Sequence, residues 1–376
     1  MLRRERGSVS SITHPPLLLA NRQSRLPSRT AGLRSPASVA DVAAVLQDYF
    51  RTRLALSNLA LAEEPIAFVN GWETHSYHFQ LQALDQLPAR LARPLAVRIY
   101  CNSMGLPRAR REFRVQNHLY QLRYPVAEPL LLEEDCSYFG GPFLIMAEVR
   151  GPTLLHSLLR WPWKLILGPL DMANAHLRLH QLPSDGFPAL PGGLLTRRLD
   201  EMAAAIREYG LNGLRAGFDW LFLHRPDPPK DPRIVHLDFH PLNVIAEKKR
   251  SLVVLDWNEA DLGDRHADVG TTMMLMDCLP GVKVTHLERL MLRTGHFYFV
   301  HEYLSTYNRR LPLDKHKLSY YRALAAFRRL CNYGRWLRDG PQISGIKPAM
   351  LQLITDHQRQ TLERYFHKWT SVSIRL

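Results

Sequence analysis

Two histidines, an aspartate and an asparagine lie within eight positions of a segment that is otherwise mostly apolar. The segment reads IVHLDFHPLNV, residues 234–244, and its polar side chains are those of His236, Asp238, His240 and Asn243. A buried turn can use one such group to satisfy its own backbone. Four polar groups so close together require a further explanation, and the chemistry of their side chains supplies one.

Asp238 and Asn243, taken with Asp256 further along, carry the atoms that phosphoryl transfer requires. In IVHLDFHPLNVIAEKKRSLVVLDW we expect the strands IVHLD and LVVLDW to form a hairpin with EKKRS as its turn, which returns Asp256 to the side of Asp238. Carboxylate and amide oxygens suit Mg²⁺, and a carboxylate can orient or deprotonate an attacking hydroxyl. Each residue alone is better explained as a turn cap or a strand end. Together they predict a magnesium site beside a proton acceptor.

The stretch HLDFHPLNVIAE…LVVLDWNEADLGDRHADVGT resembles the aminoglycoside phosphotransferase and choline kinase family, whose fold is similar to that of protein kinases. The resemblance extends over most of the chain. It implies that Asp238 is the catalytic aspartate and that Asn243 and Asp256 are Mg²⁺ ligands. Asp264 and Asp268 match the family's Gly-Asp and later Asp, and we expect them to support the site without binding the metal.

Leu237 departs from the family pattern, which has glycine at this position. The neighbouring His236 and His240 match positions that shape the loop. Because only glycine adopts positive φ freely, we expect a leucine side chain to restrict the backbone here. The sequence therefore leaves a second interpretation open, in which the chain is a non-catalytic nucleotide-binding protein (a pseudokinase) or a scaffold protein.

The same resemblance implies an ATP site in the first part of the chain. Arg98, in LAVRIY, matches the basic residue that holds ATP phosphates, a task suited to the guanidinium fork, and Glu112 matches its partner on the next helix. Gly71 matches a phosphate-covering turn, although the turn has only one glycine. In GGPFLIMAEVRGPTL, Met146 would line the adenine pocket and backbone groups of Glu148 and its neighbours would bind the base. A core strand is an equally compatible interpretation of that segment.

The expected order of elements agrees with a two-lobed fold. A helix, a hairpin in PIAFVNGWETHSYHFQLQAL, the strand LAVRIY, the helix RARREFRVQNHLYQL, and strands in PLLLEE and PFLIMAEVRG form a small, mostly antiparallel sheet. The rest of the chain is mainly helical. The predicted fold class is α+β, protein-kinase-like, with a small antiparallel β-sheet lobe and a larger helical lobe. The predicted parts are a disordered basic arm at 1–38, a nucleotide-binding lobe at 39–148, and a catalytic and substrate lobe at 149–376.

Charge is distributed unevenly along the chain. Residues 1–38 carry seven Arg and one Glu, a net charge of +6, and residues 281–376 carry seventeen basic and six acidic residues, a net charge of +11. Residues 39–280 are left with about −3 of the total of +14. The arm leaves nucleic-acid or membrane contact open, but a solvated basic surface is favoured because no aromatic residues are interleaved on a defined module.

The substrate is predicted only as a small molecule with a hydroxyl group. In the family that this chain resembles, substrate pockets are built from late helices, which are basic here. Aminoglycosides are polycations, so this charge argues against an aminoglycoside substrate. Glu259, Asp261 and Asp277 lie near the expected site and leave a cationic substrate open.

The cysteines and the hydropathy of the chain indicate in which cellular compartment the protein is expected. The four Cys are far apart and form no CxxC pair, which favours reduced thiols in the cytoplasm, and the longest apolar runs are too short to span a bilayer. We therefore expect a cytoplasmic, ATP- and Mg²⁺-dependent phosphotransferase that acts on a hydroxyl group. The sequence does not predict its oligomeric state.

Overall fold

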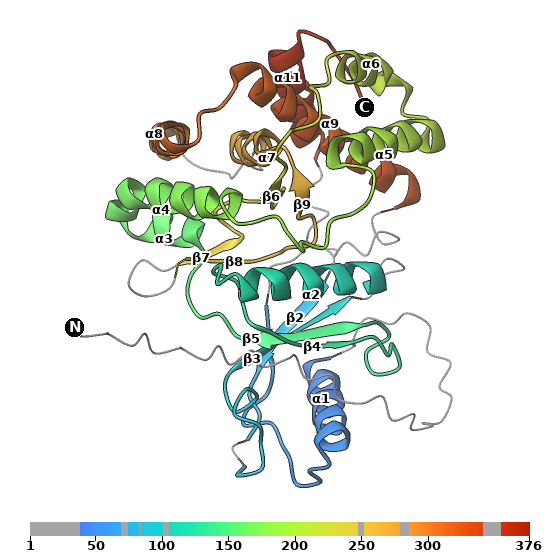
Figure 1. Cartoon of the computed structure of the whole chain (residues 1–376), viewed down its shortest axis with the longest axis vertical. Coiled ribbons are helices and arrows are strands. Elements are labelled where there is room, and N and C mark those ends of the chain that lie inside the picture. Colours follow the sequence, from blue (N-terminus) through green and yellow to red (C-terminus); the bar gives the residue numbers. More distant parts are fainter. Residues whose placement is uncertain are drawn as a thin grey trace, which may run out of the picture.

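The first part of the chain forms a five-stranded antiparallel sheet between two helices (Figure 1). A computed structural model describes residues 38–68, 74–82, 84–100, 105–246, 252–278, 286–340 and 355–376. In the sheet the strand order is β1–β2–β3–β5–β4. The elements are α1 (Val39–Leu54), β1 (Ile66–Ala67), β2 (Thr74–Phe79), β3 (Leu95–Tyr100), α2 (Gly105–Gln121), β4 (Pro129–Glu133) and β5 (Phe143–Ala147).

The alternation of side chains along β3 decides which helix each residue faces. Val97 and Ile99 are fully buried and pack in one cluster with Val42 and Leu46 of α1. Ala96, Arg98 and Tyr100 alternate with them and point to the opposite face of the sheet, where α2 lies. Arg98 is one of these residues. The apolar pattern of a single strand therefore directs this cation toward α2.

The second part of the chain is mostly helical, as expected, and holds two large apolar clusters. Figure 1 shows its helices gathered on the side of α2 that faces away from the sheet. The helices are α3 (Leu154–Arg160), α4 (Pro162–His180), α5 (Leu194–Tyr209), η1 (Asn212–Leu214, a 3₁₀ helix), α6 (Arg215–Leu223), α7 (Arg265–Asp277), α8 (His286–Arg310), α9 (Lys315–Asp339) and α11 (Asp356–Thr370).

Two small antiparallel ladders correct the predicted hairpin. β6 (Arg233–Val235) pairs with β9 (Asp261–Gly263), and β7 (Val244–Ala246) pairs with β8 (Leu252–Val254). The predicted pairing of IVHLD with LVVLDW is therefore wrong. β6 ends at Val235 because the next two backbone N–H groups donate to a side chain, that of Asp268, instead of to a neighbouring strand.

The connection between the two parts passes close to the small ladders. The segment after β5 runs through Gly151, where an added Cβ would lie 2.7 Å from the carbonyl oxygen of Ala246, so only glycine permits this approach. Ala246 N–H also donates to Pro152 O, at 2.9 Å. The strand predicted in PFLIMAEVRG is present as β5.

Several residues named in the sequence analysis lie outside the described ranges. The arm (apart from Ser38, which caps α1), Gly71 with its turn, and EKKRS fall in the ranges that the structure does not describe. Within the described ranges, no helix has the length and hydropathy needed to cross a bilayer. Cys136, Cys278 and Cys331 are free thiols.

Candidate active site

Arg98 joins the sheet to the second part of the chain. One end of its guanidinium group, Nη1, donates to Glu112 Oε1 of α2 at 2.9 Å, and Nη2 donates to Asp256 Oδ1 at 3.1 Å. Tyr100 O–H also donates to the Glu112 carboxylate. The predicted pairing of Arg98 with Glu112 is therefore present, and the structure adds Asp256 to it.

Two carboxylates, those of Glu112 and Asp256, stabilise the positive charge of Arg98. Burial raises the pKa of Glu112, and the carboxylates of Asp256 and Glu112 raise the pKa of Arg98 against the effect of its own burial. Arg98 therefore keeps its charge although only 15% of its side chain is exposed. Its Nε is buried and has no hydrogen-bond partner among the described residues.

Asp268 fixes the backbone of the loop between β6 and β7. Its two carboxylate oxygens accept the N–H groups of His236, at 2.6 Å, and Leu237, at 2.7 Å. The side chain of His236 continues the network, because Nε2 lies 2.9 Å from Leu255 O and Nδ1 accepts the N–H of Asp238 at 3.2 Å. Burial lowers the pKa of His236, so the ring is neutral and donates through Nε2. Asp268 thus supports the loop, as the family resemblance implied.

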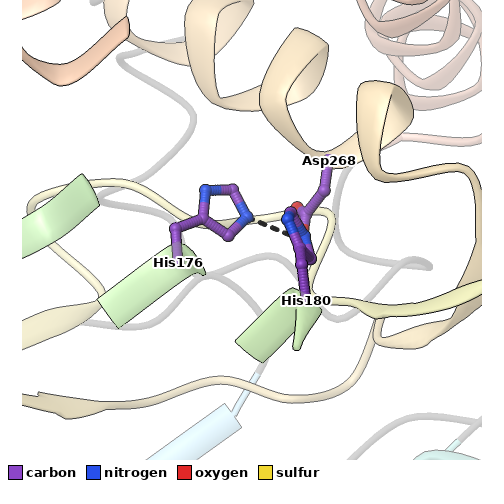
Figure 2. A group of neighbouring side chains, drawn as sticks. All are labelled: His176, His180 and Asp268. Carbon is purple, nitrogen blue, oxygen red and sulfur yellow. Dashed lines mark hydrogen bonds and ion pairs between the residues drawn. The ribbon is translucent and has the colours of Figure 1, made fainter. Parts of the chain in front are cut away.

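Two histidines of α4 lie against the same carboxylate, as Figure 2 shows. His180 Nε2 lies 3.1 Å and His176 Nε2 2.9 Å from Asp268 Oδ2, although the second contact is poorly aligned for a hydrogen bond. On the far side of each ring, Nδ1 lies 2.5 Å from a hydroxyl group of α8, Tyr303 for His176 and Tyr307 for His180. Both rings are held on two sides, so we interpret this cluster as an anchor for the loop and not as a metal site. His180 is fully buried, and both of its ring nitrogens have partners.

The anchor predicts a stability loss in mild acid. Burial, with the charge of His176, lowers the pKa of His180 to about 4 from 6.5. Between about pH 6.5 and pH 4, His180 is protonated in the unfolded chain but not in the folded chain. The free energy of unfolding should therefore fall by roughly 3 kcal/mol as the pH is lowered across that window. Urea unfolding at pH 7 and pH 5 should show a smaller loss in His180→Gln than in the wild type. Equal losses would contradict this assignment.

Leu237 adopts the left-handed conformation that the family's glycine would take. Its φ is +62°, and its side chain is only 7% exposed. A non-glycine residue with this φ is strained by about 1–2 kcal/mol. Two contacts hold this conformation despite the strain. The N–H groups of His236 and Leu237 donate to the Asp268 carboxylate, and the Leu237 side chain is buried in the core.

Leu237→Gly should therefore destabilise the protein instead of relaxing it. Relief of about 1–2 kcal/mol of strain is outweighed by about 1.5–3 kcal/mol of lost apolar burial and about 0.5–1 kcal/mol of added backbone entropy. We expect a net loss of about 1 kcal/mol in a urea titration, with kcat close to the wild-type value. A more stable Leu237→Gly protein with much higher kcat would show that leucine impairs the loop.

The same loop places Asp238 beside Asn243. Asn243 Nδ2 donates to Asp238 Oδ2 at 2.7 Å and to Asp238 O at 3.0 Å, while Leu255 N–H donates to Asn243 O at 2.9 Å. The last bond brings the segment before Asp256 against the loop. Asp238 and Asn243 are therefore joined directly, and Asp256 directly follows the residue that donates to Asn243, although the strands that carry these residues pair differently from the prediction.

Asp238 is held in its ionised form. Burial favours the neutral acid, but His240 and the charge of Arg329 outweigh it and lower the pKa of Asp238. An ionised carboxylate accepts hydrogen bonds only, so Asp238 can orient a hydroxyl group and accept its proton. His240 Nε2 lies 3.6 Å from Asp238 Oδ2.

The donors of Asn243 and Asp256 fit a divalent cation. Because Asn243 Nδ2 makes both bonds to Asp238, the amide oxygen Oδ1 is the atom that a metal ion would use. Asp256 offers a carboxylate that is 32% exposed, on a backbone with the strained φ of +66°. An amide oxygen with a carboxylate is the oxygen donor set that Mg²⁺ takes.

The segment in which a strand and hinge were predicted forms strand β5 and the residues that follow it. Met146 lies in β5, with Sδ 3.8 Å from Gln116 Nε2. Glu148 N–H donates to Pro94 O at 3.0 Å, and its side chain contacts His78 at 2.8 Å. The N–H groups of Glu148 and of the neighbouring Ala147, which donates to Glu128 O at 2.9 Å, are therefore both occupied.

The acidic residues that left a cationic substrate open are all paired with other side chains. Glu259 accepts from Arg198 and Arg328, and Asp261 pairs with Arg197 and Arg111. Asp277 accepts from Tyr365 at 2.9 Å and lies 3.4 Å from His296. These arginines are the residues that sequence reasoning missed, because helical periodicity does not show which charges of separate helices meet.

Comparison with known proteins agrees with this geometry. Residues 64–281 match the family described as the phosphotransferase enzyme family, and that range includes Arg98, Glu112, Asp238, Asn243 and Asp256. Among curated proteins, the chain is similar to acyl-CoA dehydrogenase family member 11 of Pongo abelii, with 26% identity over 180 residues. That match covers 44% of this chain and 23% of the relative, so this chain spans under a quarter of the relative's length.

Solved structures share the fold over most of the chain. A protein from Ralstonia eutropha, assigned as a candidate aminoglycoside phosphotransferase, is 20% identical with a TM-score of 0.61, covering 88% of this chain and 99% of that one. An amicoumacin kinase bound to AMP-PNP and Ca²⁺ is 14% identical with a TM-score of 0.53, covering 82% and 88%. The predicted kinase-like fold and the resemblance to aminoglycoside phosphotransferases are confirmed.

Proposed function

The chain belongs to the phosphotransferase enzyme family, and from this we propose that it transfers the γ-phosphoryl group of ATP to a hydroxyl group of a small molecule. The observation that carries the proposal is the single network in which Arg98, Asp256, Asn243 and Asp238 are joined through Leu255 and the loop. The nucleotide analogue and divalent cation bound by the amicoumacin kinase support ATP and Mg²⁺ as cofactors.

Each side chain in this network has a chemical task in the proposed reaction. Arg98, oriented by Glu112, binds phosphate oxygens through its fork. Asp238 orients the acceptor hydroxyl and takes its proton as the new O–P bond forms and the bond from phosphorus to ADP breaks. Asn243 and Asp256 would hold Mg²⁺, which supplies neutralisation of the phosphate charge. Met146 and the backbone near Glu148 would line the adenine site, and Gly71 would cover the phosphates.

The two parts of the chain would then divide the work. We propose residues 39–148 as the nucleotide-binding lobe and 149–376 as the catalytic and substrate lobe. The free thiols support a reducing, cytoplasmic location. The alternative of a non-catalytic protein rested on Leu237 and on the single glycine of the turn at Gly71. The backbone of Leu237 adopts a positive φ, which weakens the first ground, and the turn lies outside the described residues.

Arg98→Ala tests the nucleotide site. Loss of charged hydrogen bonds to phosphate should raise KM for ATP by about 10–100-fold. Arg98→Lys keeps the charge without the forked guanidinium group, so its KM should lie between those of the wild type and Arg98→Ala. The matched control is Arg110→Ala, which removes an exposed ion pair between Arg110 of α2 and Glu134 and should leave KM unchanged. ADP release measured against ATP concentration checks this, with thermal unfolding to confirm folding. An unchanged KM in Arg98→Ala would remove Arg98 from the site.

A further inference from the structure

Arg111 of α2 reaches from the first part of the chain to two segments of the second part. Its Nη1 donates to Pro188 O at 3.0 Å, in the connection between α4 and α5. Its Nη2 donates to Ala260 O and lies 3.3 Å from Asp261 Oδ1, five residues after Asp256. Only 14% of the Arg111 side chain is exposed. One guanidinium group therefore binds α2 to three acceptors of the helical part.

The carboxylate of Asp261 does not depend on Arg111 to balance its charge. Arg197 of α5 already pairs with Asp261 Oδ2 from within the second part of the chain. The N–H groups of Leu190 and Leu262 donate to Asp261 Oδ1, at 3.1 Å and 2.9 Å. Without Arg111, this buried carboxylate would still have a cation and two N–H donors. The reason for a second arginine therefore lies with the helix that carries it.

The residue that follows Arg111 on α2 is Glu112, the partner of Arg98. Successive side chains of an α-helix point about 100° apart. The two neighbours accordingly have different partners, because Glu112 binds Arg98 of the sheet and Arg111 binds the helical part. Any shift of α2 away from the helical part would displace Glu112 and, through it, the guanidinium group of Arg98.

Asp261 also lies close to the loop that carries Asp238. It is opposite Val235 in the ladder of β6 and β9, and Val235 is followed directly by His236 and that loop. Figure 1 shows α2 lying between the five-stranded sheet and the two small ladders. Arg111 therefore joins the helix that orients Arg98 to the ladder from which the loop of Asp238 begins.

We propose that Arg111 is a positioning residue for nucleotide binding, which holds α2 against the segment after Asp256 so that Arg98 can bind the ATP phosphates. The inference rests on the proposed function and adds to it a residue that acts through Arg98. Arg98 bonds to Asp256 at 3.1 Å between the same two parts of the chain. A shift of α2 would lengthen that contact and separate the phosphate-binding arginine from the proposed metal ligand. A guanidinium group suits the task because its forked donors can bind several acceptors at once.

A double-mutant cycle tests whether Arg111 acts through Arg98. The Kd of AMP-PNP with Mg²⁺ is measured by titration calorimetry for the wild type, Arg111→Met, Arg98→Ala and the double variant. The matched control is Arg110→Met, at the neighbouring position of α2, which breaks an exposed ion pair with Glu134. Urea unfolding without nucleotide shows whether each protein folds. Arg111→Lys, which keeps the charge but has fewer donors, replaces Arg111→Met in the cycle if the methionine variant does not fold.

Arg111→Met is expected to raise the Kd about tenfold in the wild-type background but less than about twofold when Arg98 is already alanine. Arg111→Lys should lie between the wild type and Arg111→Met, and Arg110→Met should bind like the wild type. A merely structural role would leave the Kd unchanged, or raise it by the same factor in both backgrounds. Either result, with nucleotide bound by the wild type, would overturn the inference and leave the proposed function standing. If the wild type binds no nucleotide, the proposed function fails and the inference fails with it.

Discussion

Replacing Asp238 with Asn is expected to lower kcat by about 10²–10⁴-fold, because the amide cannot accept the proton of the attacking hydroxyl. The substitution keeps an oxygen that can accept the 2.7 Å bond from Asn243 Nδ2, so the loop should retain its shape. Turnover of the best acceptor, or ATP hydrolysis where no acceptor has been found, measures the effect. Thermal stabilisation by ATP with Mg²⁺ should persist in the variant.

A control for this variant removes a carboxylate outside the loop. Asp356→Asn changes a residue whose side chain is 87% exposed at the start of α11, and it should turn over like the wild type. If Asp238→Asn retained most of the wild-type kcat, Asp238 would not act on the hydroxyl. If it lost nucleotide binding as well, the loop itself would have collapsed and the variant would say nothing about proton transfer.

Asp268→Asn should cost about 3–5 kcal/mol of stability and most of the activity. The carboxylate is fully buried and accepts the N–H groups of His236 and Leu237, with the rings of His176 and His180 beside it. Asparagine offers one acceptor and one donor, so a backbone N–H would face an N–H, and buried donors would lose their charged partner. The strained φ of Leu237 would lose the bond that holds it.

Urea unfolding at neutral pH measures this loss of stability. Asp356→Asn serves again as the control and should shift the unfolding free energy by less than about 0.5 kcal/mol. A variant that folds with reduced stability but normal kcat would show that the loop keeps its conformation without Asp268. That outcome would contradict the anchoring assigned to the buried cluster.

Local sequence was sufficient where a motif or a strong period carried the information. The kinase-like fold and the ion pair of Arg98 with Glu112 followed from the family resemblance, which the motif around Asp238, Asn243 and Asp256 carries. Leu237 was recognised as a residue in a glycine position, and its φ of +62° has that cause. These features depend on residues that are near in sequence or on a resemblance across the chain.

Features set by distant partners could not be predicted. The pairing of IVHLD was wrong because three-residue strands carry too little pattern to select a partner, and the true partner of β6 is β9. The arginines that bind Glu259 come from α5 and α9, and only tertiary packing shows that they meet. Tyr303 and Tyr307 are fully buried aromatic residues of α8 that also hold the two histidines of α4, a contact that the sequence does not show.

The most direct test of the central claim is the identity of the product formed from ATP. The protein is incubated with Mg²⁺, ATP and a panel of small molecules that carry hydroxyl groups, and each reaction is followed by mass spectrometry and by ADP release. The account predicts one phosphorylated hydroxyl compound formed in a one-to-one ratio with ADP by the wild type and lost in Asp238→Asn. Nucleotide binding without any phosphorylated compound, with equal slow ADP release from both proteins, would contradict it.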